Sequence, residues 1–477
     1  MSTVQPQPRA AEDEGLSQDL SHRHIRMIAM GSAIGTGLFL GTGSRLQSAG
    51  PFLAILYLVC GLFGYFMLRS LGEMIVYRPS SGSFVSYTRG FFGERGAYAV
   101  GWMYWLFWAM TAVADATAVA LYVKWFGRYT SVISATPQWV IAFVALALVL
   151  AANLISVGVF GELEFWFSLI KILALIIFML IGIYCLIKGD TNGAANGFQL
   201  LNQQGGLLPK GLFSALIVMQ GVVFAYSGIE LVGTTAGEAK DARTQIPKAI
   251  DLVIVRIIVF YFGSVVLLCL LLPYSSYSDN VSPFVTFLDS IGVPAAAPIM
   301  QLVVITAALS SLNAGLYSTG RIVRSLSLAG SAPEWAGRLN KSGVPFGGIA
   351  LTAIVGVLGV IVNFVMPSQA FEVMINMASV GVITCWASIC LSHLKFVKAA
   401  QAGQFERPDY KAPFYPVADY LTLIFLAGVV ILMGFDKPIG TWSLVVCVVI
   451  VAPALFFGWK AVERSGRKPA ANVDFEV

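Results

Sequence analysis

Long apolar runs separated by short polar segments make up most of this chain. A helix of about 20 apolar residues crosses the hydrocarbon core of a bilayer, and about twelve runs reach that length. The pattern therefore predicts an all-α polytopic membrane protein with about 12 transmembrane helices. The predicted spans are 25–48, 50–76, 97–126, 138–157, 163–187, 209–238, 246–273, 294–322, 346–366, 369–395, 416–435 and 439–460.

Two of these spans contain glycine-bearing interruptions. The first carries Gly31, Gly35 and Gly37 within a few residues, and the sixth carries Phe-Ala-Tyr-Ser-Gly at 224–228. Glycine is a poor helix former, so these positions permit the backbone to unwind. Unwound backbone at membrane depth is tolerated only where it faces protein or lines a wet cavity. A matched pair of breaks in two halves of a chain is typical of transporters, which bind substrate between them.

The positions of the breaks divide the first ten spans into two units of five. Because each unit has an odd number of helices, the second enters the membrane with the opposite orientation, which predicts a 5+5 inverted repeat with broken helices 1 and 6. The predicted segments are a disordered cytoplasmic tail at 1–22, a transport core at 23–397 with halves at about 25–187 and 209–397, helices 11 and 12 at 416–460, and a cytoplasmic tail at 461–477.

Composition and charge agree with a membrane protein and indicate its orientation. Only 12% of residues are charged, about half the fraction usual in soluble domains. Basic residues gather before the first span and after the second, sixth, eighth, tenth and twelfth, so both termini are expected in the cytoplasm. The net charge of +5 is explained by this bias and predicts no nucleic-acid partner. No removable signal peptide is expected, and the six cysteines form no CxxC pair that would indicate a metal site.

Several long motifs, in a fixed order, carry a family resemblance. They are HIRMIA at 24–29, GSAIGTGLFLGTG at 31–43, PSSGSFVSYTRGFFG at 79–93, FAYSGIELVGTTAGEAKD at 224–241 and ALSSLNAGLYSTGR at 308–321. From about residue 20 to about residue 460 the chain resembles the amino-acid permeases of the amino acid–polyamine–organocation superfamily. Among its subfamilies the chain is most similar to bacterial L-asparagine permeases.

The resemblance implies a secondary active transporter that imports a neutral amino acid, first of all L-asparagine, by alternating access. It implies a proton as the coupling ion, no sodium, no cofactor and a place in the bacterial inner membrane. Permeases for glycine, alanine, serine or GABA, and amino-acid exchangers, are the alternatives. An enzyme is not expected, since no HExxH or Gly-x-Ser-x-Gly motif is present. A channel would need a repeated selectivity loop, which the sequence lacks. The oligomeric state stays open.

The two breaks offer complementary backbone groups. In the first span one half-helix is expected to end near Ala33 and Ile34, and the next to begin near Gly37 with unpaired amides. The resemblance places the substrate carboxylate on Gly35, Thr36 and Gly37; the alternative is that these glycines only allow close packing. In the sixth span, freed carbonyls would accept hydrogen bonds from the ammonium, and an aromatic ring would cover the substrate or simply pack in the core. The residues concerned are Phe224, Ala225, Tyr226 and Ser227.

Lys171 is a charged residue inside the fifth span, which is costly and usually functional. The resemblance places its ammonium where sodium sits in sodium-coupled relatives. The expected acceptors are carbonyls near Gly31 and Ile34 and the hydroxyls of Ser310 and Ser311. The alternatives are snorkelling toward the cytoplasm and pairing with Glu162 or Glu164.

Other polar residues at membrane depth are candidates for reading the substrate side chain or for gating. Asp115 in the third span is the first candidate for the side-chain subsite, with Thr234 and Asn313 behind it. A buried, locally hydrogen-bonded aspartate is the alternative. Glu238 is expected to form a cytoplasmic gate with Arg23 or Arg26.

Overall fold

The computed structural model describes residues 14–16, 20–31, 34–189, 196–239, 241–279, 281–367 and 369–467. Within these ranges the regular elements are helices, with one isolated bridge between Leu20 and Ala239. Nine helical stretches of the described residues are long and apolar enough to cross a membrane. The shorter helix Val417–Met433 and the two interrupted stretches account for the remaining predicted spans. The expectation of an all-α polytopic membrane protein is confirmed.

The helices follow the apolar runs in order. The membrane-length stretches and their parts are α1 (His22–Gly31), α2 (Thr36–Phe39), α3 (Gly41–Ala49), α4 (Leu53–Tyr77), α5 (Ser83–Trp125), α7 (Gln138–Ile155), α8 (Val157–Lys188), α10 (Gly211–Ile217), α11 (Met219–Ala225), α12 (Leu231–Thr234), α13 (Ala242–Asp251), α14 (Val253–Arg256), the π-helical η4 (Ile257–Gly263), α15 (Ser264–Leu271), α17 (Ala296–Leu328), α18 (Phe346–Val365), α19 (Ala370–Gln401), α20 (Val417–Met433), α21 (Ile439–Val446), the π-helical η7 (Cys447–Val451) and α22 (Ala452–Ser465). Shorter helices in the connections are α6 (Ser131–Ala135), α9 (Gly197–Gln203), α16 (Pro283–Ser290) and the 3₁₀ turn η6 (Glu334–Gly337).

Both predicted breaks are present. The first span is divided into α1, α2 and α3, and the sixth into α10, α11 and α12. Ala33, expected at the end of the first half-helix, lies outside the described residues.

The segment between the second and third spans differs from the prediction. It was expected to be a basic loop, but α5 already begins at Ser83 and continues through a kink at Gly93 into the third span. This segment is polar, yet residues 83–89 are all buried, and the hydroxyls of Thr88 and Ser392 lie 3.4 Å apart across the contact with α19. Tertiary packing therefore extends the helix beyond the apolar run.

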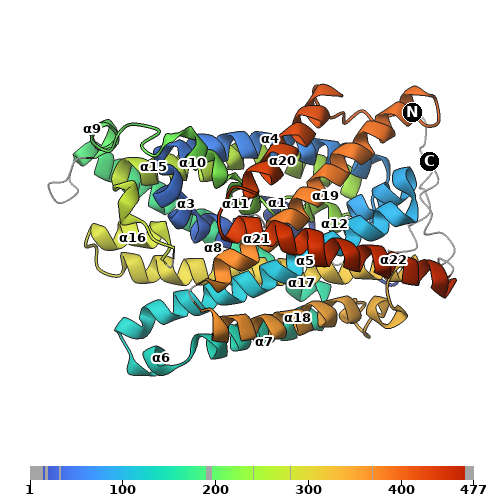
Figure 1. Cartoon of the computed structure of the whole chain (residues 1–477), viewed down its shortest axis with the longest axis horizontal. Helices are drawn as coiled ribbons and strands as arrows, with labels where there is room; N and C mark the ends of the chain where they lie inside the picture. Colours follow the sequence, from blue (N-terminus) through green and yellow to red (C-terminus); the bar gives the residue numbers. More distant parts are fainter. Residues whose placement is uncertain are drawn as a thin grey trace.

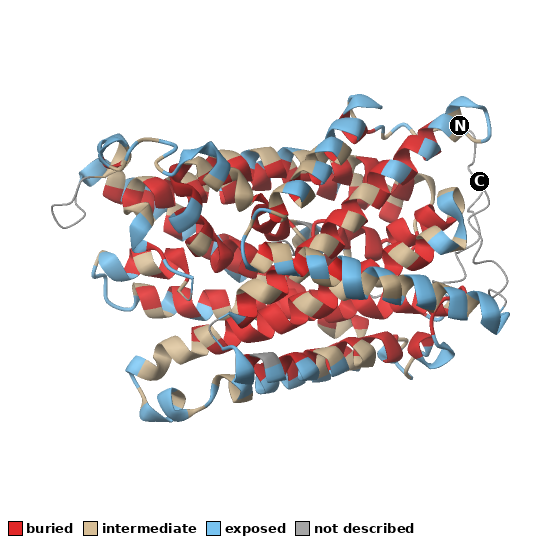
Figure 2. Ribbon diagram, in the orientation of Figure 1, coloured by how far each residue is buried: buried red, intermediate tan, exposed pale blue. Residues whose placement is uncertain are grey.

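The bundle is centred on α5, which packs along α17 and α19 and, on another side, against α7 and α18. Figure 1 shows the long helices running side by side, with α6, α9 and α16 gathered at one end. Burial is concentrated in the middle of the bundle (Figure 2). The outer helices α21 and α22 instead expose apolar side chains such as Trp442 and Phe457, as contact with lipid requires.

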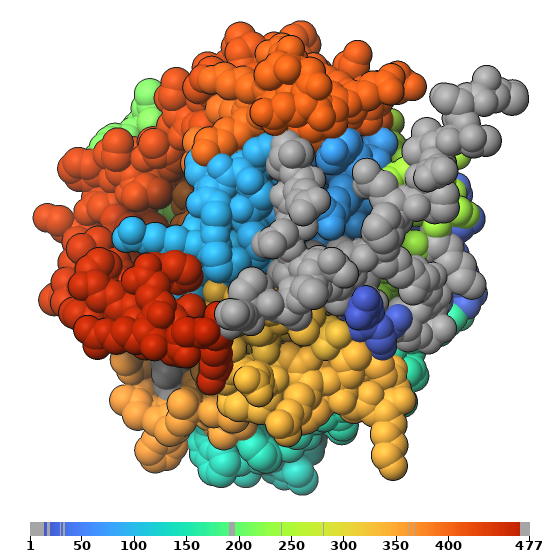
Figure 3. Space-filling view, turned by 90° about the vertical axis from the view of Figure 1, so that its right-hand side faces the viewer, coloured from blue at the N-terminus to red at the C-terminus, as the bar shows by residue number. Residues whose placement is uncertain are grey.

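Both described ends of the chain lie at the same end of the bundle. Arg324, near the end of α17, donates to the Glu14 carbonyl at 2.7 Å, and Arg467 donates to the Ala332 carbonyl at 3.3 Å. Figure 3 views this end, where the segment before the third span, the η6 region, residues 402–416 and the end of α22 are brought together. The arrangement requires an even number of crossings between residues 14 and 467.

Candidate functional site

The first break leaves backbone amide groups free of the helix ladder. Gly35 has an extended conformation (φ −131°, ψ −157°), and its carbonyl accepts from the amides of Leu38 and Phe39 at 3.2 and 3.1 Å. The first amides of a helix have no intrahelical acceptor. In α2 these are the amides of Thr36 and Gly37, both of which are buried. They are the groups available to a carboxylate.

The two breaks are in direct contact. A Cβ added at Gly37 would lie 2.6 Å from Ala225 Cα, closer than real Cβ atoms essentially ever come, and 3.1 Å from the Ala225 nitrogen. A Cβ at Gly35 would instead lie 3.4 Å from Ser311 Cβ, at the edge of ordinary contact distance. Gly37 is therefore required for close packing of the two broken helices, and Gly35 is not crowded in this way.

The second break is held open by a buried carboxylate that was not among the predicted site residues. Gly228 has a φ of 92°, in the left-handed region that favours glycine. The Gly228 amide donates to both Glu230 oxygens at 3.2 Å, and Trp386 Nε1 donates to Glu230 Oε2 at 3.3 Å. Glu230 thus accepts from a backbone amide of the break and from the Trp386 side chain.

The carbonyls expected to receive the substrate ammonium divide into two groups. The Phe224 carbonyl accepts from the Ser227 amide at 2.9 Å, so it is already engaged. Among the described residues, no backbone amide outside the helices donates to the carbonyls of Ala225 and Ser227. The carbonyls of Ala225 and Ser227 are therefore the remaining candidates to accept hydrogen bonds from the substrate ammonium.

The aromatic residues of the second break pack in the core. The Tyr226 ring stacks on Tyr261 with centroids 4.4 Å apart, and its hydroxyl donates to the Tyr57 carbonyl at 2.7 Å. Phe224 is also buried, with its ring centroid 6.5 Å from that of Phe107. In this conformation Tyr226 therefore packs in the core and does not cover a substrate.

Asp115 is hydrogen-bonded to a residue of the first break. Its Oδ1 accepts from the Thr36 hydroxyl at 2.7 Å, and the residue is fully buried. Oδ2 is buried without a hydrogen bond of normal geometry in the described part of the chain. The Ser311 hydroxyl and the Lys171 charge also act on this carboxyl. Asp115 thus offers a carboxyl oxygen next to the backbone groups of the break.

Lys171 on α8 reaches the other side of the same break. Its Nζ donates to the Gly31 carbonyl at 2.7 Å and to Ser310 Oγ at 2.9 Å, two of the four expected acceptors. The Gly31 carbonyl also accepts from the Ile34 amide at 3.0 Å. Ser311, the fourth expected acceptor, faces Gly35 instead. Lys171 is fully buried, so it does not snorkel to the surface.

Glu164 completes the lysine cluster. Its Oε2 accepts from Ser310 at 2.9 Å, so one hydroxyl joins the ammonium and the carboxylate. Its Oε1 accepts from Asn313 at 2.9 Å, and Asn313 in turn is bonded by Asn153. Lys171 follows Glu164 by seven positions, which places both on one face of α8. The sequence signal for this cluster was the spacing of two charged residues within an apolar helix, and Glu164 is one of the two partners considered for Lys171 from the sequence.

Two predicted subsite residues are engaged elsewhere. The Thr234 hydroxyl donates to the Leu231 carbonyl of its own helix at 2.9 Å. Asn313 belongs to the Glu164 cluster, as described above. Of the three side-chain candidates, only Asp115 bonds to a residue of a break.

The predicted gate has a different cationic partner. Glu238 bonds to Arg321 Nη2 at 3.0 Å and to the Tyr317 hydroxyl, and both charged groups are buried. Arg23 pairs with Glu162, and Arg26 is exposed. The expected pairing of Glu238 with Arg23 or Arg26 is therefore wrong for this conformation, because α17 brings Arg321 closer.

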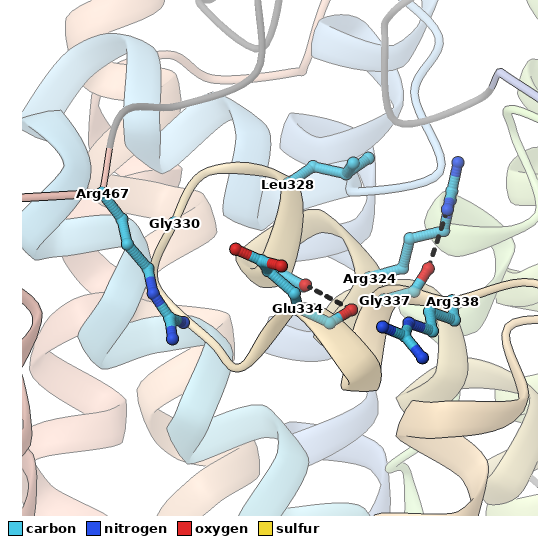
Figure 4. Close-up of a pocket in the computed structure, with 8 residues that line it drawn as sticks. Arg324, Leu328, Gly330, Glu334, Gly337, Arg338 and Arg467 are labelled. Atoms are coloured by element: carbon cyan, nitrogen blue, oxygen red, sulfur yellow. Dashed lines mark hydrogen bonds between the residues drawn. The ribbon is translucent and has the colours of Figure 1, made fainter. Parts of the chain in front are cut away.

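The Tyr317 ring also stacks on Phe160 at 3.8 Å between centroids, so α8, α17 and the segment after α12 are in contact at the η6 end. A cavity of about 500 Å3 lies farther toward that surface (Figure 4). It contains none of the predicted site residues; Figure 4 shows Arg338 and Arg467 on opposite sides of Glu334.

Comparison with known proteins gives the same assignment over nearly the whole chain. The Amino acid permease family matches residues 24–473. An L-asparagine permease of Streptomyces coelicolor is 53% identical over 458 residues, covering 96% of this chain and 93% of the relative. L-asparagine permease 1 of Mycobacterium tuberculosis is 52% identical, covering 95% and 92%. The L-asparagine permease of Escherichia coli K12 is 50% identical, covering 95% and 90%. The chain belongs to the amino acid permease family, and it is a multi-pass membrane transporter, not an enzyme.

Proposed function

We propose that this protein imports L-asparagine across the bacterial inner membrane together with protons. The contact between the two helix breaks at Gly37 and Ala225, with Asp115 bonded beside it, is the observation that carries the proposal. The three relatives described above are each named for asparagine, and each covers nearly the whole chain.

The substrate α-carboxylate binds the free amides of Thr36 and Gly37, where the start of a helix favours negative charge. The α-ammonium binds the carbonyls of Ala225 and Ser227 across the contact. The α-carboxylate and the α-ammonium are common to all amino acids, so these contacts do not distinguish asparagine. Asp115 supplies the discrimination for the carboxamide.

Lys171 couples transport to protons. Its ammonium donates to the last carbonyl of α1, so loss of the proton would replace a charge-assisted hydrogen bond at the edge of the first break by a weaker neutral one. A fixed ammonium in this place also leaves no room for a sodium ion, and no cofactor is required.

Both termini face the cytoplasm in this proposal. The end of the bundle in Figure 3 carries the predicted basic loops, which favour the cytoplasmic side. Accordingly, α6, α9 and α16 face the periplasm or exterior.

Reconstituted uptake of labelled L-asparagine tests the proposal. Uptake should saturate, rise with an inward proton gradient and fall when unlabelled asparagine is added. Competition by alanine, glycine, serine or GABA in preference to asparagine would assign another substrate. Uptake that needs internal amino acid and ignores the gradient would identify an exchanger.

A further inference from the structure

A second polar cavity lies near the breaks, at the end of the bundle opposite Glu14 and Arg467. Its volume is about 370 Å3, within the range of small-molecule sites, about 300–1,000 Å3. It is formed by α3, the start of α11, the start of α19 and the connection between α20 and α21. Arg45 lies against Gly221, four residues before Ala225 on α11, and Ala225 in turn lies against Gly37, so the cavity is next to the proposed substrate site.

The cavity is built around a buried arginine. The Arg45 side chain is 4% exposed; Nη1 donates to the Gly41 carbonyl, and Nη2 lies 3.8 Å from a Glu372 oxygen. Nε has no hydrogen-bond partner among the described residues. A Cβ at Gly221 would lie 1.8 Å from this Nε, so the guanidinium fills space that a side chain on α11 would occupy. A buried guanidinium with so few partners favours an added anion.

Acceptors for a cation line the same cavity. Glu372 accepts from Ser44 at 3.0 Å and retains only the loose contact with Arg45. Asp436 accepts from Gln220 Nε2 at 3.0 Å, while Gln220 Oε1 is buried without a partner in the described ranges. Burial raises the pKa of the Asp436 carboxyl, against the opposing effect of Arg45, which means that its anion is incompletely stabilised. An ammonium placed here would meet these two carboxylates and an amide oxygen, in a cavity that the exposed Asp279 and Lys437 also line.

We propose that this cavity is a receiving site for an amino-acid zwitterion, with Arg45 binding the carboxylate and Glu372 and Asp436 binding the ammonium. The proposal rests on the proposed import of an amino acid from this side of the membrane. A site of this kind raises the local concentration of substrate beside the breaks, and its described lining residues include none of the proton-coupling cluster around Lys171.

The test compares Arg45→Gln with Arg128→Gln, which removes a half-exposed arginine from the same end of the bundle. Initial uptake of labelled asparagine is measured against concentration in oriented proteoliposomes, together with efflux from the lumen. Arg45→Gln should raise the half-saturation concentration for uptake by about tenfold, as expected for one charge-assisted contact. The half-saturation concentration for efflux and the maximal rate of uptake should stay near those of the wild type and of Arg128→Gln. The maximal rate of efflux should fall by the same factor by which the half-saturation concentration for uptake rises, because the gradients alone fix the asparagine ratio at equilibrium.

Asp436→Asn gives a second test if Arg45→Gln is poorly folded, because Asp436 is only partly buried. It should raise the half-saturation concentration for uptake and leave that for efflux unchanged. An unchanged half-saturation concentration for uptake in both variants would overturn the receiving site. Equal changes in the half-saturation concentrations for uptake and efflux would also overturn it. The wild-type protein decides the proposed function separately: if it carries another amino acid, the same comparison is made with that amino acid.

Discussion

Lys171 Nζ lies 2.7 Å from the carbonyl oxygen of Gly31, the last residue of α1 before the first break. The same ammonium is joined through Ser310 to the Glu164 carboxylate. A charged group that can exchange a proton is therefore bonded to the backbone whose geometry defines the substrate site. This contact gives the proposed coupling a physical route, because deprotonation of Lys171 would weaken its bonds to Gly31 and Ser310 by removing their charge assistance.

Replacing Lys171 by alanine should abolish accumulation of asparagine driven by a proton gradient. Exchange of labelled for unlabelled asparagine at equal pH should persist, because the backbone groups that bind the substrate are retained. Lys188→Ala is the matched control, since Lys188 is an exposed residue at the end of the same helix. Gradient-driven accumulation by Lys171→Ala at the wild-type level would leave Lys171 a structural role only.

Alanine at Gly37 and alanine at Gly35 should have different consequences. The new Cβ at Gly37 would meet backbone of the opposite break at 2.6 Å, whereas that at Gly35 would meet a serine side chain at 3.4 Å. Overpacking of this kind costs about 1–3 kcal/mol. Binding of labelled asparagine to purified Gly37→Ala should therefore fall by about tenfold or more, with Gly35→Ala close to wild type. Equal binding by the two variants would contradict the close contact of the breaks.

Removal of the Glu238 carboxylate should loosen the η6 end of the bundle. Glu238→Gln leaves Arg321 buried without its counter-charge, a change that costs about 3–5 kcal/mol when a buried pair is broken. Hydrogen–deuterium exchange over residues 226–239 should rise as the local structure opens.

The double variant Glu238→Arg with Arg321→Glu should restore part of this protection by exchanging the two charges. Arg338→Gln, which changes an exposed arginine at the same end, should have no effect. If protection over 226–239 is unchanged in Glu238→Gln, the buried pair does not hold this end closed.

The features visible in the sequence were those that depend on local chemistry. Glycines within apolar runs located both breaks, and the improbability of a lysine at membrane depth singled out Lys171. The contacts that sequence reasoning missed join distant segments: Arg321 is 83 residues from Glu238, and Trp386 is 156 residues from Glu230. Such pairings depend on how helices are placed against one another, which periodicity does not encode. Tyr226 was ambiguous for the same reason, since its packing against Tyr261 is set by α11 and η4 together.

Asp115 should determine selectivity, and its bond to Thr36 allows two mechanisms to be separated. If Oδ2, which has no hydrogen bond of normal geometry among the described residues, faces the substrate carboxamide, Asp115→Ala should weaken asparagine binding more than alanine or glycine binding, because only asparagine loses a polar partner. If Asp115 acts by holding Thr36 in the break, all three substrates should weaken equally. Thr36→Val removes that hydroxyl bond and keeps Asp115, so it reports the positioning effect alone. We expect competition assays to show a loss for asparagine in Asp115→Ala that exceeds the loss for alanine by about tenfold, with no such difference in Thr36→Val. Equal losses for every substrate in Asp115→Ala, matched by Thr36→Val, would assign Asp115 to the geometry of the break and leave the carboxamide to be recognised elsewhere.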